Sequence, residues 1–311
     1  MTFQLDEMLE LGRPVARVVV AVTQGSVPRE VGASLLVWDG GVSGTIGGGA
    51  LEYQAIANAR KCLDNGNTRF DRLPLGPGLG QCCGGAVGLL TEVWEPQALA
   101  DLDGVVARKV DGHSTPMPLS VKRVLSAARQ HGDVPDPQLL DGWMIEAVSR
   151  PQSELWVWGA GHVGRALIGV LAPLPDFKLR WADTDRARFP DRIPANVESL
   201  IAENPGDLVT LAAPDSLHFV MTFSHALDLD ICHRVLGQSF GFLGLIGSST
   251  KRARFRKRLA ALGHSSAQID RIQCPIGDPL LGKQPQAIAL GVAGEVIRMR
   301  RLGVGSMKVL A

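Results

Sequence analysis

The stretch Leu155-Trp-Val-Trp-Gly-Ala-Gly-His-Val-Gly164 decides how the C-terminal half of this 311-residue chain folds. A short apolar run leads into three glycines, and a helical pattern follows them from Arg165 to Leu171. Such a turn lets Gly159 reverse the chain, Gly161 bring the backbone close to a phosphate, and Gly164 pack the helix tightly. The stretch therefore predicts a Rossmann-like strand-turn-helix unit, which either binds a nucleotide or keeps its glycine turn for the fold alone.

The residues beyond this turn continue the alternation of strands and helices that is typical of a parallel sheet. Asp183 ends the next apolar run about 20 residues further on, where an acid reaches a ribose hydroxyl. Later apolar runs are predicted as further parallel strands: Leu208–Ala212, Phe219–Phe223 and Phe242–Ile246. We therefore expect an α/β fold with a doubly wound parallel sheet over residues 151–311.

Two histidines fall where open α/β sheets bind their ligands. His162 lies inside the glycine turn, and His225 follows a predicted strand in Ser224-His-Ala-Leu-Asp228. A histidine and a carboxylate one helical turn apart can exchange protons with a ligand, and such residues can also cap a helix. His162 and His225 are thus candidate ligand-binding residues with a structural alternative.

The N-terminal half begins with strands. Ala16–Thr23, Ala33–Trp38 and Ala86–Trp94 are rich in β-branched and apolar residues, and Ala50–Leu63 has helical spacing. We expect an α/β domain with a mixed sheet over residues 1–96. Residues 97–150 contain several prolines and are predicted as a connecting region with one helix near Val121–Gln130.

A second glycine turn, Gly44-Thr-Ile-Gly-Gly-Gly-Ala-Leu-Glu52, precedes the predicted helix of the N-terminal half. Free N–H groups of Gly47, Gly48 and Gly49 would form an anion-binding nest suited to phosphate, and a flexible turn is the alternative. Arg29 lies on a nearby loop and could pair with the same phosphate, or lie in solvent.

Gln81, Cys82 and Cys83 lie inside the glycine-rich run from Gly76 to Gly85. This segment is predicted either as a binding loop for an anionic or redox-active ligand or as a tight loop with one buried cysteine. Zinc is disfavoured because the other cysteines, Cys62, Cys232 and Cys274, do not stand at ligand spacing.

Composition narrows the classes of function. Lys and Arg number 32 against 31 Asp and Glu, so the formal net charge of +1 disfavours binding to nucleic acid or to an acidic membrane. The polar N-terminus lacks signal-peptide character and the cysteines form no disulfide framework, so we expect a cytoplasmic protein. The basic run Lys251–Arg258 is predicted as a solvated helix face or as a surface for a partner or a phosphate.

These motifs, in this order, resemble the XdhC/CoxI family of accessory proteins for xanthine dehydrogenase and related molybdenum hydroxylases. The resemblance rests on Gly25–Arg29, Gly44–Glu52, Leu79–Gly85, Trp158–Ala166, Gly244–Arg252 and Cys274–Gly277. It departs at Thr222-Phe223, where the family tends to carry Thr-His.

Membership implies a non-catalytic homodimer that binds molybdenum cofactor. It implies protection of the cofactor while a NifS-like cysteine desulfurase adds the sulfido ligand, and delivery to apo-xanthine dehydrogenase. The cofactor-binding residues expected are Arg29, Gly47, Gly48, Gly49, Gln81, Cys82, Cys83, Gly159, Gly161, His162, Gly164, Asp183 and His225, with Cys82 or Cys83 on the metal side. Two rival functions are an NAD(P)-dependent oxidoreductase and a cofactor-free scaffold that bridges dehydrogenase and desulfurase.

Overall fold

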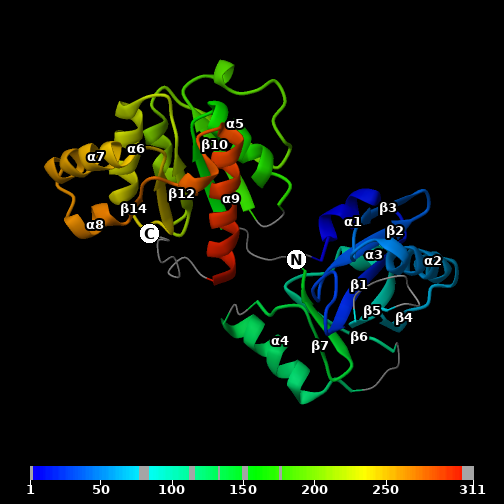
Figure 1. The fold of residues 1–311 in the computed structure, drawn as a ribbon. Helices are drawn as coiled ribbons and strands as arrows, with labels where there is room; N and C mark the ends of the chain where they lie inside the picture. The colour runs from blue at the N-terminus through cyan, green and yellow to red at the C-terminus, as the bar shows by residue number, and fades with distance from the viewer. Residues whose placement is uncertain are drawn as a thin grey trace. The chain divides into compact units, whose positions relative to one another are not determined.

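The computed structural model describes residues 3–76, 84–111, 116–131, 134–148, 153–174 and 177–302. The chain divides into two compact units, Met1–Arg150 and Pro151–Ala311, each with its own sheet and core. Figure 1 shows both units as ribbons. Each unit is described by itself below.

The first unit is built on a five-stranded antiparallel sheet with the order β3-β2-β1-β5-β4. Its strands are β1 (Val15–Gln24), β2 (Ser34–Trp38), β3 (Gly41–Gly44), β4 (Arg69–Pro74) and β5 (Ala86–Trp94). Helix α2 (Gly49–Asn65) buries Leu51, Ala55 and Ala59 against this sheet. The short helices α1 (Leu5–Leu11) and α3 (Pro96–Leu99) complete this part. The strands and the helix expected in this half are confirmed.

Residues 97–150 form a second sheet and do not merely connect two domains. Three antiparallel strands have the order β6-β8-β7, namely β6 (Val105–Lys109), β8 (Trp143–Ala147) and β7 (Gln138–Leu140), and α4 (Leu119–His131) is the expected helix. These strands have three to five residues, which is too short for a clear alternation of apolar and polar positions. The prolines that indicated a connection lie between these elements.

A buried ion network joins the two sheets of the first unit. Arg17 on β1 donates two hydrogen bonds of 2.9 and 2.8 Å to Glu146 on β8. Arg108 on β6 binds the same carboxylate and also Glu92 on β5, with Nε 2.9 Å from the Glu92 oxygens. Breaking such a buried pair leaves an uncompensated charge, so the network fixes the second sheet to the first.

The second unit has a six-stranded parallel sheet with the order β11-β10-β9-β12-β13-β14. The strands are β9 (Ser153–Trp158), β10 (Phe177–Asp183), β11 (Val197–Ile201), β12 (Leu217–Val220), β13 (Phe242–Leu245) and β14 (Ile272–Gln273). Counted along this unit the order is 3-2-1-4-5-6, which is that of dinucleotide-binding Rossmann folds. The expected doubly wound sheet is therefore confirmed.

Helices cover both faces of this parallel sheet (Figure 1). One face packs against α5 (His162–Leu171) and α9 (Pro285–Leu302), and the other against α6 (His225–Leu236), α7 (Ser249–Ala261) and α8 (Ser266–Asp270). Short 3₁₀ turns occupy η2 (Arg186–Arg188), η3 (Pro205–Leu211) and η4 (Pro279–Leu281). No helix in the described ranges is long and apolar enough to cross a membrane.

One strand prediction in this unit is wrong. The run Leu208–Ala212 lies largely within the 3₁₀ turn η3 and is not a strand. Asn204 caps that turn by accepting a hydrogen bond from the Gly206 N–H, and Pro205 favours the first helical position, so these local signals outweigh the apolar run. The strand in this part of the chain is β11, which escaped prediction because Glu198, Ser199 and Ile201 are exposed at the sheet edge and leave no apolar run.

Candidate functional site

The glycine turn after β9 lies at the point where the strand order of the parallel sheet reverses. Gly159 has φ +119°, and a Cβ there would lie 2.5 Å from the Met221 carbonyl oxygen. A Cβ on Gly164 would lie 2.0 Å from the Gly159 oxygen, so this glycine permits the helix to approach the turn. The packing of the unit itself therefore requires both glycines.

Gly161 differs from its two neighbours in the turn. Its φ is −76°, and a Cβ placed on it would meet nothing within 4 Å. The fold does not require glycine at this position, and the open space lies at the N-terminus of α5, where N–H groups and the helix dipole favour an anion. His162, the first residue of α5, is exposed beside it. The turn can accept a phosphate close to its backbone.

Asp183 binds the backbone of the glycine turn. Its side chain is buried, and Oδ2 accepts a 2.6 Å hydrogen bond from the Ala160 N–H. Oδ1 accepts from the Thr184 N–H at 2.7 Å, and the Arg188 Nε lies 2.8 Å from it as an ion pair. The sequence reasoning assigned this carboxylate to a ribose hydroxyl, whereas here both oxygens are engaged by the protein.

Arg188 and Phe223 face each other across this sheet edge. The Arg188 guanidinium carbon lies 3.9 Å from the centroid of the Phe223 ring, and Phe223 is 61% exposed. Arg188 follows β10 and Phe223 follows β12, so the stacked pair joins chain segments on the two sides of the β9 turn. Neither residue was among the predicted site residues, although the departure at Phe223 was noted.

His225 and Asp228 do not act as a pair. Ser224 caps α6 by accepting from two backbone N–H groups, and His225 is exposed. Asp228 is fully buried and accepts from the Thr222 N–H at 2.9 Å and from Lys251 Nζ at 2.6 Å. The imidazole–carboxylate arrangement considered from the sequence is replaced by a buried Asp228–Lys251 ion pair, which spacing along the chain gave no means of finding.

Beside this ion pair a cavity of about 430 Å³ opens along α7. It is lined by His225, Ser248, Thr250, Lys251, Arg254, Phe255, Lys257 and Arg258. The basic run noted in the sequence thus supplies one wall, and the start of α6 supplies His225. We name this cavity the α7 groove.

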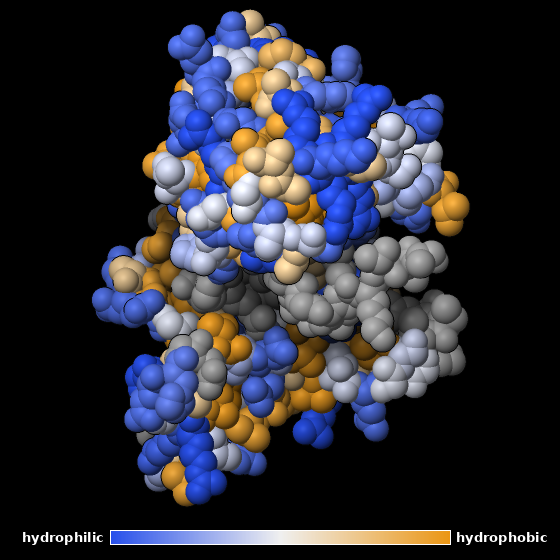
Figure 2. All heavy atoms as spheres, turned by 90° about the vertical axis from the view of Figure 1, so that its left-hand side faces the viewer, coloured by the Kyte–Doolittle hydropathy of each residue, from blue (hydrophilic) through white to orange (hydrophobic). Residues whose placement is uncertain are grey.

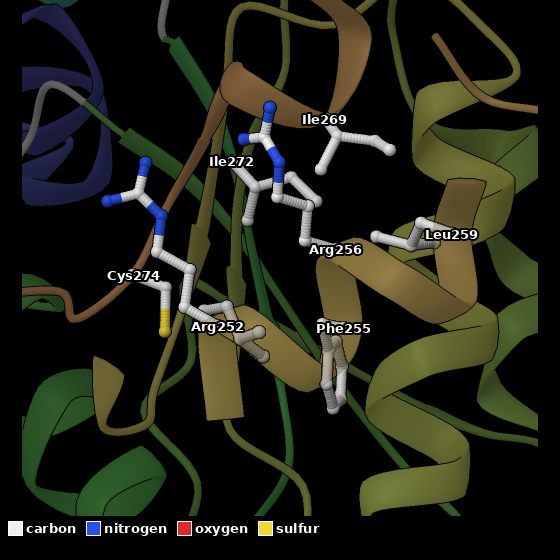
Figure 3. A pocket seen from close by; sticks show the side chains of 8 residues that line it. Arg252, Phe255, Arg256, Leu259, Ile269, Ile272 and Cys274 are labelled. Atoms are coloured by element: carbon white, nitrogen blue, oxygen red, sulfur yellow. The ribbon is translucent and has the colours of Figure 1, made fainter. Parts of the chain in front are cut away.

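A smaller pocket lies on another side of α7, with a volume of about 20 Å³ (Figure 3). Arg252 and Arg256 from α7 flank it in Figure 3, with Cys274 nearby. Burial raises the pKa of the Cys274 thiol, which disfavours the reactive thiolate. The volume suits about one water molecule, so this pocket is not a ligand site.

The predicted anion nest of the first unit is filled by a carboxylate of its own helix. Gly47, Gly48 and Gly49 all have positive φ, a conformation that favours glycine, and they form the turn before α2. Glu52 Oε2 accepts from the Ile46 N–H at 3.0 Å and from the Gly48 N–H at 3.1 Å, while the Gly47 N–H donates to the Thr45 hydroxyl. Burial raises the pKa of Glu52, but the hydrogen bonds from Thr45 and the turn outweigh it and leave the pKa below its usual range.

Three N-terminal motifs meet at one place in the first unit. A Cβ on Gly47 would lie 2.6 Å from Pro28, and a Cβ on Gly85 would lie 2.3 Å from the Ser26 oxygen. Arg29, on the same loop as Ser26, donates to the Thr45 oxygen at 3.3 Å. Gly85 belongs to the glycine-rich run around the double cysteine. The loop that carries Arg29, the filled nest and the described end of that run are therefore neighbours.

Gln81, Cys82 and Cys83 lie outside the described residues, and their assignment to a cofactor stays a prediction. Within the described ranges, no group of three or more His, Cys, Asp or Glu side chains is arranged to hold a metal ion. Cys62 and Cys232 are buried free thiols, which fits packing residues.

Two family models match the chain. The model described as the XdhC and CoxI family matches residues 8–74, and the model described as the XdhC Rossmann domain matches residues 155–296. The matched ranges contain the Arg29 loop and the filled nest in the first unit, and the glycine turn and the α7 groove in the second.

Two similar proteins extend over most of the chain. Uncharacterized protein YqeB of Escherichia coli (strain K12) is 25% identical over 299 residues, which are 94% of this chain and 45% of that protein. The chain thus spans about half the length of that curated relative. A crystal structure described as a xanthine dehydrogenase from Bacillus halodurans has a TM-score of 0.75 and 19% identity, and covers 99% of this chain and 98% of that chain. This likeness supports the fold of the chain.

Proposed function

Because the chain belongs to the XdhC and CoxI family, we propose that it is an accessory protein for the maturation of xanthine dehydrogenase. In this proposal it binds molybdenum cofactor, protects it while a cysteine desulfurase adds the sulfido ligand, and delivers it to the apoenzyme. The protein then performs no catalytic step of its own. A homodimer that docks both partners is part of the proposal.

The observation that carries the proposal is the meeting of the three N-terminal motifs. The Arg29 loop, the Gly47 turn and the Gly85 end of the double-cysteine run lie against one another in the first unit. A phosphorylated pterin with a dithiolene-bound metal needs a cation or N–H donors at one end and shelter at the other. The Arg29 cation and the N–H donors of the Gly47 turn gather here. Glu52 accepts from those donors in this structure and would have to release them to a phosphate.

Retention of the cofactor tests the proposal. Protein mixed anaerobically with molybdenum cofactor would be separated by ultrafiltration, and the retained pterin measured by fluorescence after oxidation. The unaltered protein should retain the pterin, and Cys82→Ala or Cys83→Ala should weaken retention about tenfold, as loss of a contact worth about 1.4 kcal/mol predicts. Cys62→Ala removes the same atom from a buried thiol of α2 and serves as the control. Pterin found entirely in the filtrate of the unaltered protein would contradict the proposal.

A second candidate, nucleotide binding by the Rossmann unit, is favoured by one observation. Gly161 leaves open space at the N-terminus of α5 that no packing requirement explains. Quenching of tryptophan fluorescence on titration with NAD would measure such binding. Hydride transfer to any hydroxy acid or aldehyde by the unaltered protein would replace the accessory role by that of an oxidoreductase.

A further inference from the structure

The α7 groove carries a positive charge that no carboxylate of the described residues balances in full. Lys251 at its base is neutralised by Asp228, since both side chains are nearly buried and their charged atoms are 2.6 Å apart. Arg254, Lys257 and Arg258 are exposed, and among the described residues no carboxylate forms an ion pair with any of them. Three cations therefore face one groove without an ion-pair partner among the described residues.

This arrangement does not arise from the needs of the helix. Phe255 and Leu259 anchor α7 to the core, and the basic residues occupy the other faces. Like charges three or four residues apart destabilise a helix by about 0.2–0.5 kcal/mol per pair. Cations near the N-terminus of a helix also oppose its dipole. The carboxylates on the neighbouring α6 and η3, Asp230 and Asp207, pair with Arg234 and leave the groove uncompensated.

The volume of the α7 groove fits a small molecule. Its volume of about 430 Å³ falls within the range of about 300–1,000 Å³ that small-molecule sites occupy. The Lys and Arg side chains of α7 line one wall, and His225 lies at the start of α6, so the cations line a concavity rather than project from a flat face. In Figure 2, which faces the α7 and α8 side, hydrophilic side chains gather on this part of the surface.

We infer that the α7 groove binds the diphosphate group of a small phosphorylated ligand. Two adjacent phosphates carry enough negative charge to balance Arg254, Lys257 and Arg258, and guanidinium groups bind phosphate through two parallel hydrogen bonds. The groove lies next to the carboxyl ends of β12 and β13, the edge at which open α/β sheets bind their ligands. The inference goes beyond the proposed function, because it holds whether or not the chain carries molybdenum cofactor.

Titration with inorganic pyrophosphate by calorimetry tests this inference on the full chain. The unaltered protein should bind pyrophosphate more tightly than sulfate. Arg254→Gln and Arg258→Gln should each weaken pyrophosphate binding about tenfold, as loss of a charged contact worth about 1.4 kcal/mol predicts. Arg252→Gln is the matched control, because it makes the same change at an exposed residue of α7 that lines the smaller pocket instead. It should change the affinity less than twofold.

Three outcomes would overturn the inference. The first is no heat of binding from the unaltered protein. The second is an equal loss of affinity in Arg252→Gln and Arg254→Gln, which would indicate general attraction of anions to the helix. The third is a salt-dependent complex of the groove with an acidic protein while pyrophosphate fails to compete. Thermal midpoints of the three variants, expected to equal that of the unaltered protein, show that each still folds.

Discussion

Two glycine turns precede helices in this protein, and they differ in what occupies them. At the Gly47–Gly49 turn the N–H groups of Ile46 and Gly48 donate to Glu52, which lies in the first turn of the following helix. At Gly159–Gly164 the helix has no acidic residue in its first turn, and Asp183 accepts from one N–H of the turn, that of Ala160, so the space at Gly161 stays open. A glycine-rich turn therefore indicates an anion site only when no carboxylate of the chain already fills it.

We expect the largest loss of stability from a methyl group added to the Gly159–Gly164 turn at a position where the fold has no room for it. Gly164→Ala places a Cβ 2.0 Å from the Gly159 oxygen and should lower the free energy of unfolding by about 3 kcal/mol, as overpacking predicts. Gly161→Ala should leave stability within about 0.5 kcal/mol, because nothing lies within 4 Å of the added atom. Urea denaturation of the two variants measures the difference. Equal stabilities would show that the turn is looser than described.

Removing the Asp183 carboxylate, which binds the Gly159–Gly164 turn, should cause the next largest loss of stability. Asp183→Asn keeps an acceptor for the Ala160 N–H but loses the charge that faces Arg188, at a cost of about 2 kcal/mol. If NAD binds, its affinity should fall as well, because the turn shifts. Asp191→Asn, an exposed change of the same type on the following loop, is the control. Chemical denaturation and NAD titration would be run on both, and indistinguishable curves would remove Asp183 from the support of the turn.

Removing the carboxylate that fills the Gly47–Gly49 turn should have a smaller effect on stability. Glu52→Ala should lower stability by about 1 kcal/mol, a typical cost for the loss of a helix cap. The freed Ile46 and Gly48 donors should then bind sulfate, so added sulfate should raise the thermal midpoint of the variant more than that of the unaltered protein. Glu10→Ala, which alters an exposed carboxylate on α1, is the control. No gain from sulfate would mean that the turn is not an anion site.

The smallest expected effect is the pH dependence of the stability that Glu52 contributes to the folded protein. Its pKa in the folded protein lies below its ordinary value of 4.5, so its stabilising contribution is present above about pH 4.5 and is lost as the pH falls through the lower folded pKa. Below pH 4.5 the stability difference between the unaltered protein and Glu52→Ala should therefore shrink. Thermal midpoints across this window measure it, and a constant difference would contradict the assigned hydrogen bonds.

Much of the fold followed from the sequence, because long regular patterns carry it. The apolar run before Gly159, the glycine turn and the helix after it predicted the parallel sheet, and the structure confirms them. The sheet of residues 97–150 was missed, since strands of three to five residues show no period. Its place in the first unit depends on Arg17–Glu146 contacts between residues far apart in the chain, which no local pattern reveals.

The candidate site was predicted less completely than the fold. The glycines of both turns were found, but Asp183 was assigned to a ribose hydroxyl and Glu52 was given no role. Glu52 could have been recognised, because an acid in the first turn of a helix often accepts from the residues before it. The pairing of Asp228 with Lys251 and of Arg188 with Phe223 depends on which loops the sheet brings together, so it needed the structure.

The stacked indoles inside the second unit give this protein an optical signature. Trp156 and Trp158 lie on β9 with ring centroids 4.8 Å apart and an angle of 11° between their planes, and His218 stacks beside Trp158. Transitions of two indoles held so close couple to each other, and this coupling adds a pair of bands to the far-ultraviolet circular dichroism spectrum. Those bands originate in the second unit and vanish when its sheet separates. Their loss on heating, followed beside the total ellipticity, would tell the melting of one half of the molecule from that of the other without any label.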